Sequence, residues 1–211
     1  LPYAQSLGEL PRYLQQLEME SNGKGTDRQG RPLSRATMPV VWGEAGTDGQ
    51  HSFYQLLHQG GALIPCEFIA LKEADFPLPG HHAKLLANCF AQSQALMLGK
   101  TLAEAEAELQ AAGLPPAEVA RLAPYKVFPG NQPSTTLVLP RLDPYNLGRL
   151  IALYEHKTFA LGVLWNLNSF DQWGVEYGKQ LANQLLPVIE GKAAAEGLDA
   201  STAGLIAACR S

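Results

Sequence analysis

A carboxylate, an imidazole and an ammonium group stand in this sequence in patterns that could support acid–base chemistry. Glu20 follows Gln16 by four residues, so a helix would place this carboxylate and this amide on one face. That face is displaced from a stripe of leucines, which directs both side chains away from the core. A solvated helix end is the plainer interpretation. A carboxylate is nevertheless unfavourable at a helix C-terminus, where the macrodipole is negative, so a functional reason for Glu20 stays open.

The imidazole belongs to His51, which follows a glycine-rich turn. Glycines recur every three residues over 43–49, and Thr47 and Gln50 are spaced as a capping box, so we expect a helix to begin near residue 48. The turn lacks the Lys-Ser/Thr ending of a P-loop and the spacing of a dinucleotide fingerprint, which argues against a nucleotide. In the first turn of a helix, His51 could donate or accept a proton near neutral pH. A structural histidine is the alternative.

The ammonium group belongs to Lys179. Ser169 and Gln172 are spaced as a second capping box, so we expect a helix from about Phe170 onwards. Gln172, Glu176 and Lys179 would share one face of it, and a surface Glu-Lys pair is the plainer interpretation. Apolar residues on the neighbouring positions favour instead a partly enclosed Lys179.

Metals, nucleic acids and membranes find little support in the sequence. His51 and His58 are seven residues apart, which is not a zinc-binding spacing. The formal net charge is -4 and no basic cluster interleaves with aromatic residues, so no nucleic-acid partner is expected. No apolar run approaches the roughly 20 residues of a membrane helix. We therefore expect a protein whose partners are small molecules or other proteins.

The cysteines and the amino end of the sequence indicate the cellular compartment of the protein and whether the sequence is a piece of a longer one. Cys66, Cys89 and Cys209 are odd in number and have no paired spacing, which suits a reducing cytoplasm. The amino end shows no secretory signal pattern. Because the sequence begins with Leu1 and opens at once into a helical pattern, we expect it to be a piece of a longer protein.

The order of apolar segments predicts a single α/β domain. Helices are predicted over about 6–20, 82–100, 101–112, 144–165 and 170–190, with one more beginning near 48 and a short one opening at 115–118, and strands over 38–43, 63–71 and 135–139. Strands that are continuous apolar runs separated by helices argue for a mostly parallel sheet covered on both faces, a three-layer α/β/α arrangement. Sites in such folds lie at the carboxyl ends of the strands.

Three blocks of the sequence resemble signature blocks of the glucose-6-phosphate isomerase (phosphoglucose isomerase) family. They are MESNGK at 19–24, WGEAGTDGQHSFYQLLHQG at 42–60 and SFDQWGVEYGK at 169–179. The blocks occur in the family's order, and the similarity runs along essentially the whole chain. Ala45 stands where the family commonly has proline, and Asp48 where it commonly has asparagine. Neither substitution touches a proposed catalytic group.

The resemblance implies a role for each candidate residue. Glu20 would move a proton between C2 and C1 of an open-chain sugar, His51 would assist ring opening, and Lys179 would lie by the ring oxygen. Gln16 and Gln172 would line the sugar. Interconversion of glucose 6-phosphate and fructose 6-phosphate through a cis-enediol needs no metal or redox cofactor, so none is expected.

The resemblance also implies an organisation. Residues 1–211 would be the carboxyl-terminal sugar isomerase (SIS-like) domain, with 170–211 as a helical tail. The amino-terminal domain, with the loop that holds the substrate's phosphate and the arginine that steadies the enediolate, would be missing, so this piece alone would be almost inactive. In a homodimer, His51 would serve the neighbouring subunit's site. The alternative is a non-catalytic module for sugar-phosphate binding or dimerisation.

Overall fold

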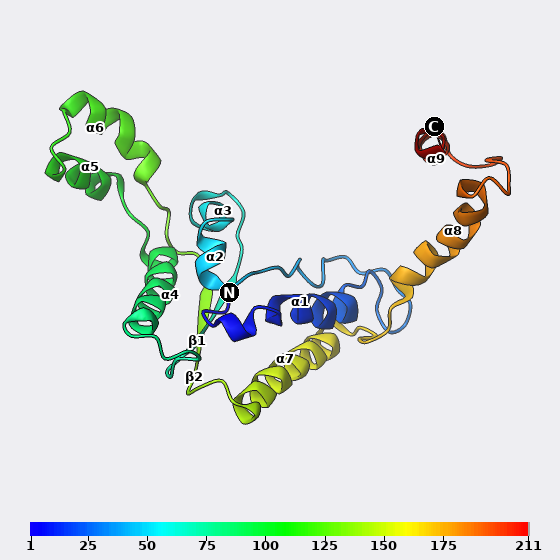
Figure 1. The fold of residues 1–211 in the computed structure, drawn as a ribbon, viewed down its shortest axis with the longest axis horizontal. Coiled ribbons are helices and arrows are strands. Elements are labelled where there is room, and N and C mark those ends of the chain that lie inside the picture. Colours follow the sequence, from blue (N-terminus) through cyan, green and yellow to red (C-terminus); the bar gives the residue numbers. More distant parts are fainter. Residues whose placement is uncertain (211) are drawn as a thin grey trace.

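Helices flank a small parallel sheet in the computed structural model of this chain, which describes residues 1–210 (Figure 1). The elements are η1 (Gln5–Leu7), α1 (Leu10–Leu14), η2 (Gln15–Glu20), α2 (Gly46–Gln50), α3 (Tyr54–Gln59), β1 (Cys66–Leu71), α4 (His81–Leu98), α5 (Leu102–Ala111), α6 (Pro116–Leu122), η3 (Ala123–Lys126), β2 (Ser134–Leu139), α7 (Pro144–Trp165), α8 (Trp173–Ile189) and α9 (Ala200–Arg210).

The sheet is parallel. β1 and β2 pair in register from Cys66 opposite Ser134 onwards. On the other side of β1 the first residues of the chain run alongside it: the Tyr3 amide donates to the Ile69 carbonyl at 2.7 Å, and the Ile69 amide to the Leu1 carbonyl at 3.1 Å. The predicted strands at 63–71 and 135–139 are therefore confirmed, with small shifts at their starts.

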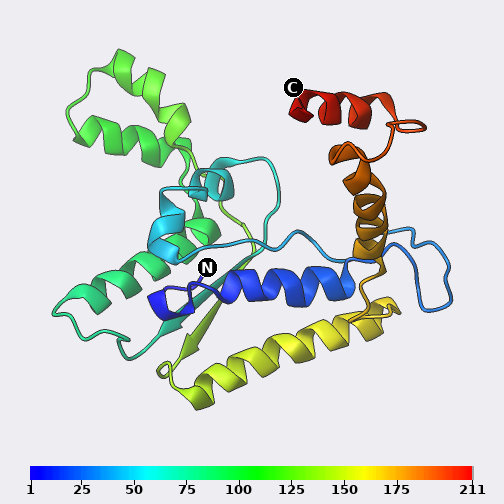
Figure 2. The same ribbon diagram turned by 45° about the vertical axis from the view of Figure 1, so that its right-hand side comes forward.

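Alternate residues of β1 enter two separate cores, as the period of a strand requires. On one face Cys66, Phe68 and Ala70 pack with Tyr54, Leu57, Cys89 and Leu96 from α3 and α4; on the other Ile69 and Leu71 pack with Leu10 and Leu14 of α1 and Leu150 and Tyr154 of α7. Figures 1 and 2 show α4 and α7 on opposite sides of the strands. The predicted α/β architecture, with helices on both faces of a parallel sheet, is confirmed.

The strand predicted over 38–43 is wrong. These residues run as a single segment without a strand partner, and Val40 is 74% exposed. Pro39 has no N–H to give to a ladder, and the Val41 amide instead faces the Met19 sulfur at 3.2 Å. An apolar run of strand length therefore forms no strand here.

The helix predicted to begin near residue 48 is divided in the structure into two short helices, α2 and α3. α2 begins at Gly46 and ends at Gln50, and no side chain caps its start. The predicted capping box does not form, because α2 begins at Gly46 with Ala45 as its N-cap, so Thr47 lies inside the helix; the Gln50 Nε2 donates to the Tyr3 hydroxyl at 2.8 Å. His51 directly follows α2 as its C-cap, so its predicted placement in the first turn of a helix is wrong.

The two long carboxyl-terminal helices differ in how well their starts could be predicted. α7 matches its predicted bounds, with Pro144 in its first turn and the Asp143 side chain accepting from the Asn146 amide. α8 begins only at Trp173, and the predicted capping box at its start is absent. The Ser169 hydroxyl is engaged elsewhere, as the candidate site shows.

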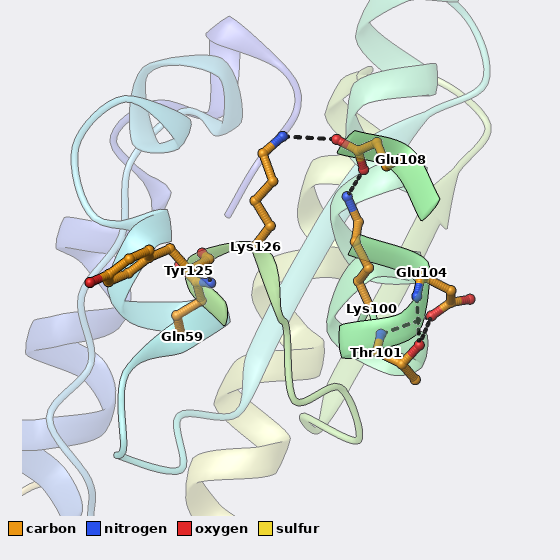
Figure 3. Close-up of polar contacts among 7 residues, drawn as sticks. All are labelled: Gln59, Lys100, Thr101, Glu104, Glu108, Tyr125 and Lys126. Atoms are coloured by element: carbon orange, nitrogen blue, oxygen red, sulfur yellow. Dashed lines mark hydrogen bonds and ion pairs between the residues drawn. The ribbon is translucent and has the colours of Figure 1, made fainter. Parts of the chain in front are cut away.

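Two groups of helices project from the sheet. α5, α6 and η3 form an arm with a small core of its own, and α8 and α9 extend on the other side (Figure 1). On the arm, Glu108 accepts hydrogen bonds from Lys100 at 2.5 Å and Lys126 at 2.9 Å (Figure 3). Gln59 of α3 reaches the arm through its Nε2, which donates to the Tyr125 carbonyl at 3.0 Å.

Candidate functional site

Glu20 is the last residue of a helical segment that passes from α-helix to π-helix. The single helix predicted over 6–20 forms in three pieces: η1, then α1, then the π-helix η2, which ends at Glu20. π-helical turns recur at functional sites, where the extra residue per turn realigns side chains. Gln16 is exposed and Glu20 half-buried. Within residues 1–210 no hydrogen bond or ion pair engages the Glu20 carboxylate.

Asn22, just beyond Glu20, joins three distant segments. Its side chain is fully buried; Nδ2 donates to the Thr158 carbonyl at 2.8 Å, and Oδ1 accepts from the Ser169 hydroxyl at 2.6 Å. Gly162 permits this approach, because a Cβ there would overlap the Ser169 hydroxyl. The sequence places Asn22 in a recognisable block but carries no signal for its contacts, which span more than a hundred residues.

Lys24 makes a second link to the same region. Its Nζ donates to the carbonyls of Glu20 at 2.7 Å, Ser21 at 2.9 Å and Asp171 at 2.5 Å. Burial lowers the pKa of Lys24 below its ordinary value, and the nearby carboxylates of Asp171 and Glu20 oppose this shift. The residue before Gln172 is thereby held beside the helix end that carries Glu20.

Gln172 and Lys179 lie on the start of α8. Gln172 immediately precedes the helix, and both side chains are exposed. The expected enclosure of Lys179 is wrong for the described chain, because α8 leads away from the sheet and its apolar neighbours are exposed too, Trp173 by 54%. The structure therefore brings Gln16, Glu20 and the segment before Gln172 into one region, with Lys179 further along α8.

His51 is not part of this region. It lies at the end of α2 and is exposed. Figures 1 and 2 both show α2 and α8 well apart, on either side of α1. One copy of the chain therefore does not bring His51 to Glu20 and Lys179.

An ion cluster around the buried Glu18 of η2 was missed from the sequence. Glu18 is only 2% exposed; its Oε1 lies 3.1 Å from the Lys157 Nζ, which is also 3.6 Å from Glu67 Oε2. Burial raises the pKa of Glu18, and Lys157 opposes that shift. Glu18 follows Leu14 by four residues, so it lies on the leucine stripe, and this spacing is the signal that could have revealed its burial.

The larger of two described cavities, about 510 Å³, lies at the amino ends of the strands. Its walls are mostly apolar, with Glu18, Glu67 and Lys157 among its polar residues, and none of Gln16, Glu20, His51, Gln172 or Lys179 lines it. Over residues 1–210 no cluster of three or more His, Cys, Asp or Glu side chains could hold a metal ion. In the same span no helix is long and apolar enough to cross a membrane.

These features define a class of protein. A parallel sheet with helices on both faces carries a half-buried carboxylate, Glu20, at a helix end, and no hydrogen bond or ion pair within residues 1–210 engages it. A carboxylate is a common general acid or base in enzymes.

The comparisons with known proteins name the family. A family model described as phosphoglucose isomerase matches residues 1–206, and the chain belongs to this family. It is 68% identical over 210 residues to a glucose-6-phosphate isomerase of Dechloromonas aromatica (strain RCB), and 60% identical over 209 residues to one of Rhizobium meliloti (strain 1021). The alignments cover 100% and 99% of the chain but only 38% and 39% of these relatives. The chain thus spans less than two fifths of their length.

Solved structures agree with this assignment. A crystal structure of a glucose-6-phosphate isomerase from Chlamydia trachomatis D/UW-3/Cx is 38% identical, with a TM-score of 0.76, and the match covers 99% of this chain and 37% of that one. A hypothetical protein from Thermus thermophilus has a TM-score of 0.57 at 28% identity, and the match covers 88% of this chain and 40% of that one. The α/β fold of this chain is therefore the fold of the phosphoglucose isomerase family.

Proposed function

We propose that this chain, joined to the rest of the family's sequence, interconverts glucose 6-phosphate and fructose 6-phosphate. The observation that carries the proposal is the unpaired Glu20 carboxylate, held in one region with Gln16 and the segment before Gln172. The relatives named as glucose-6-phosphate isomerases, which match along nearly the whole chain, support it.

The proposed chemistry is one proton moved between neighbouring carbons. After ring opening, Glu20 takes the proton from C2 of the aldose, the C1 carbonyl oxygen takes up a proton from solvent to become a hydroxyl, and a cis-enediol forms. Glu20 then returns its proton to C1 as the C2 hydroxyl releases its proton to solvent and becomes the ketone, so no electron acceptor is consumed. Gln16 and Gln172 donate hydrogen bonds to the sugar, and Lys179 lies by the ring oxygen.

His51 acts in this proposal from a second copy of the chain. Its exposure and the distance of α2 from α8 support a homodimer in which His51 of one subunit assists ring opening at the site of the other.

The proposed function also implies a domain organisation. Residues 1–211 form a carboxyl-terminal SIS-like domain, in which residues 170–211 are a helical tail, and the substrate's phosphate is bound by an amino-terminal domain. By itself this domain is nearly inactive.

The cellular setting follows from the reaction. We place it in glycolysis and gluconeogenesis, in the cytoplasm, and the three free cysteines agree with a reducing compartment.

Glu20→Gln in the full-length protein tests the proposal. We expect kcat for fructose 6-phosphate to fall by ~10²–10⁴-fold, because the amide cannot accept the C1 proton of this ketose, with no exchange of that proton into solvent. Glu9→Gln is the matched control, since Glu9 is exposed and pairs only with Arg12 on the surface. Activity of Glu20→Gln within a few-fold of wild type would remove Glu20 as the base. Binding of fructose 6-phosphate by wild type without turnover would favour the non-catalytic module.

A further inference from the structure

Lys24 has a contact set unlike that of the other lysines with described partners. Its ammonium group offers three N–H donors, and three backbone carbonyls accept them, those of Glu20, Ser21 and Asp171. No carboxylate within residues 1–210 lies at ion-pair distance from it. The charge of Lys24 is thus directed at backbone oxygens.

Two of these carbonyls belong to the end of the helix that carries Glu20. The last carbonyls of a helix have no partner within it, and a cation placed there also interacts favourably with the helix dipole. Lys24 therefore fixes the final turn, the turn from which the Glu20 side chain extends.

The third carbonyl belongs to a segment 147 residues away in the sequence. Asp171 directly precedes Gln172, after which α8 begins and leads to Lys179. α8 itself projects from the sheet with mostly exposed side chains, so the preceding residues set its direction (Figures 1 and 2). The hydrogen bond from Lys24 to Asp171 therefore links the direction of α8 to the position of the helix end that carries Glu20.

We propose that Lys24 is a positioning residue, which holds the helix end carrying Glu20 at a fixed distance from the turn carrying Gln172. It touches neither substrate nor reacting atoms. Asn22 anchors the same loop independently through Thr158 and Ser169, so loss of the Lys24 contacts changes the geometry of the site without unfolding it. The role in catalysis rests on the proposed function, whereas the link between the two segments does not.

The first test measures the link in the full-length protein by hydrogen exchange and mass spectrometry. Lys24→Met keeps the length of the side chain and removes its donors. We expect amide exchange in residues 172–179 to rise about tenfold, with exchange in β1 unchanged, because only the contact at the start of α8 is lost. Lys24→Arg, which retains N–H donors, should recover part of the protection. Lys192→Met is the control, since Lys192 is exposed and its one ion pair within residues 1–210 is with Glu190. Unchanged exchange in Lys24→Met overturns the proposal.

The second test separates positioning from plain stability. In Lys24→Met we expect kcat to fall about 30-fold per folded molecule with KM changed less than about threefold, since a displacement of about 1 Å can cost ~10²-fold in rate. A purely structural role would lower the amount of folded protein and leave kcat unchanged, which overturns positioning even if exchange rises. If wild type shows no isomerase activity, the proposed function fails while the exchange experiment still decides the link.

Discussion

At the scale of single residues, Glu18 makes stability depend on pH. Its pKa in the folded chain is raised above the ordinary 4.5, chiefly by burial. Between pH 4.5 and the raised value the unfolded chain has lost this proton and the folded chain still holds it, so stability falls as pH rises through that interval. Above the folded pKa the loss is complete and the curve levels off.

Glu18→Gln removes this titration and keeps the shape of the side chain. We expect the unfolding free energy of wild type, minus that of the variant, to decline from pH 4.5 upwards and then flatten. Urea unfolding followed by circular dichroism at a series of pH values measures it. Glu196→Gln, at an exposed position, should give a difference without this decline. A difference that rises with pH contradicts the assignment.

At the scale of elements, the packing of α7 against the loop before α8 depends on one glycine. A Cβ at Gly162 would overlap the Ser169 hydroxyl and come within 3.2 Å of Asn22 Oδ1, whereas a Cβ at Gly148, on the same helix, meets nothing within 4 Å. Gly162→Ala should therefore break the Ser169–Asn22 hydrogen bond and destabilise the chain by ~1–3 kcal/mol. Gly148→Ala should stabilise it by ~0.5–1 kcal/mol, because alanine favours the helix. Equal shifts of both variants in thermal unfolding would contradict this account.

The elements also show what could be predicted from the sequence. α7 and the strands β1 and β2 were predictable, because their periodicity and the proline and aspartate at the start of α7 act locally. The two capping boxes failed because their helices begin elsewhere, α2 at Gly46 and α8 at Trp173. The side chains of Gln50 and Ser169 meet distant partners, Tyr3 and Asn22. Local spacing cannot reveal a competitor that only the fold brings near.

The same limit applies to the candidate site. Glu20 and Gln16 stand out by their spacing on a helix face away from the leucines, and the structure leaves both accessible. The contacts of Lys24 join residues 147 apart, and no pattern encodes them. The enclosure expected for Lys179 failed because apolar neighbours on a helix do not by themselves bury it, and the described chain leaves that face of α8 uncovered.

At the scale of the whole molecule, the arm formed by α5, α6 and η3 is fastened partly by charge. Hydrogen bonds from Lys100 and Lys126 lower the pKa of Glu108 from 4.5 to about 2 (Figure 3). A carboxylate with a depressed folded pKa contributes stability above pH 4.5 that is lost as pH falls toward 2. The three side chains are partly exposed, so salt screens the contribution.

Acid should therefore loosen the arm before the sheet. On lowering the pH from about 5.5 to about 3.5, we expect the protection factors of α5 and η3 amides to fall more than those of β1, and added salt to act in the same direction. In Glu108→Gln the α5 and η3 amides should have lower protection from the start, and that protection should depend less on pH and on salt. Glu106→Gln lies on the same helix but outside the ion pairs of Glu108 with Lys100 and Lys126, so it should behave like wild type. Protection factors from hydrogen exchange followed by NMR measure these changes. Equal loss of protection in the arm and in β1 would mean that the arm opens only with the whole fold, and that Lys100, Glu108 and Lys126 do not govern its attachment.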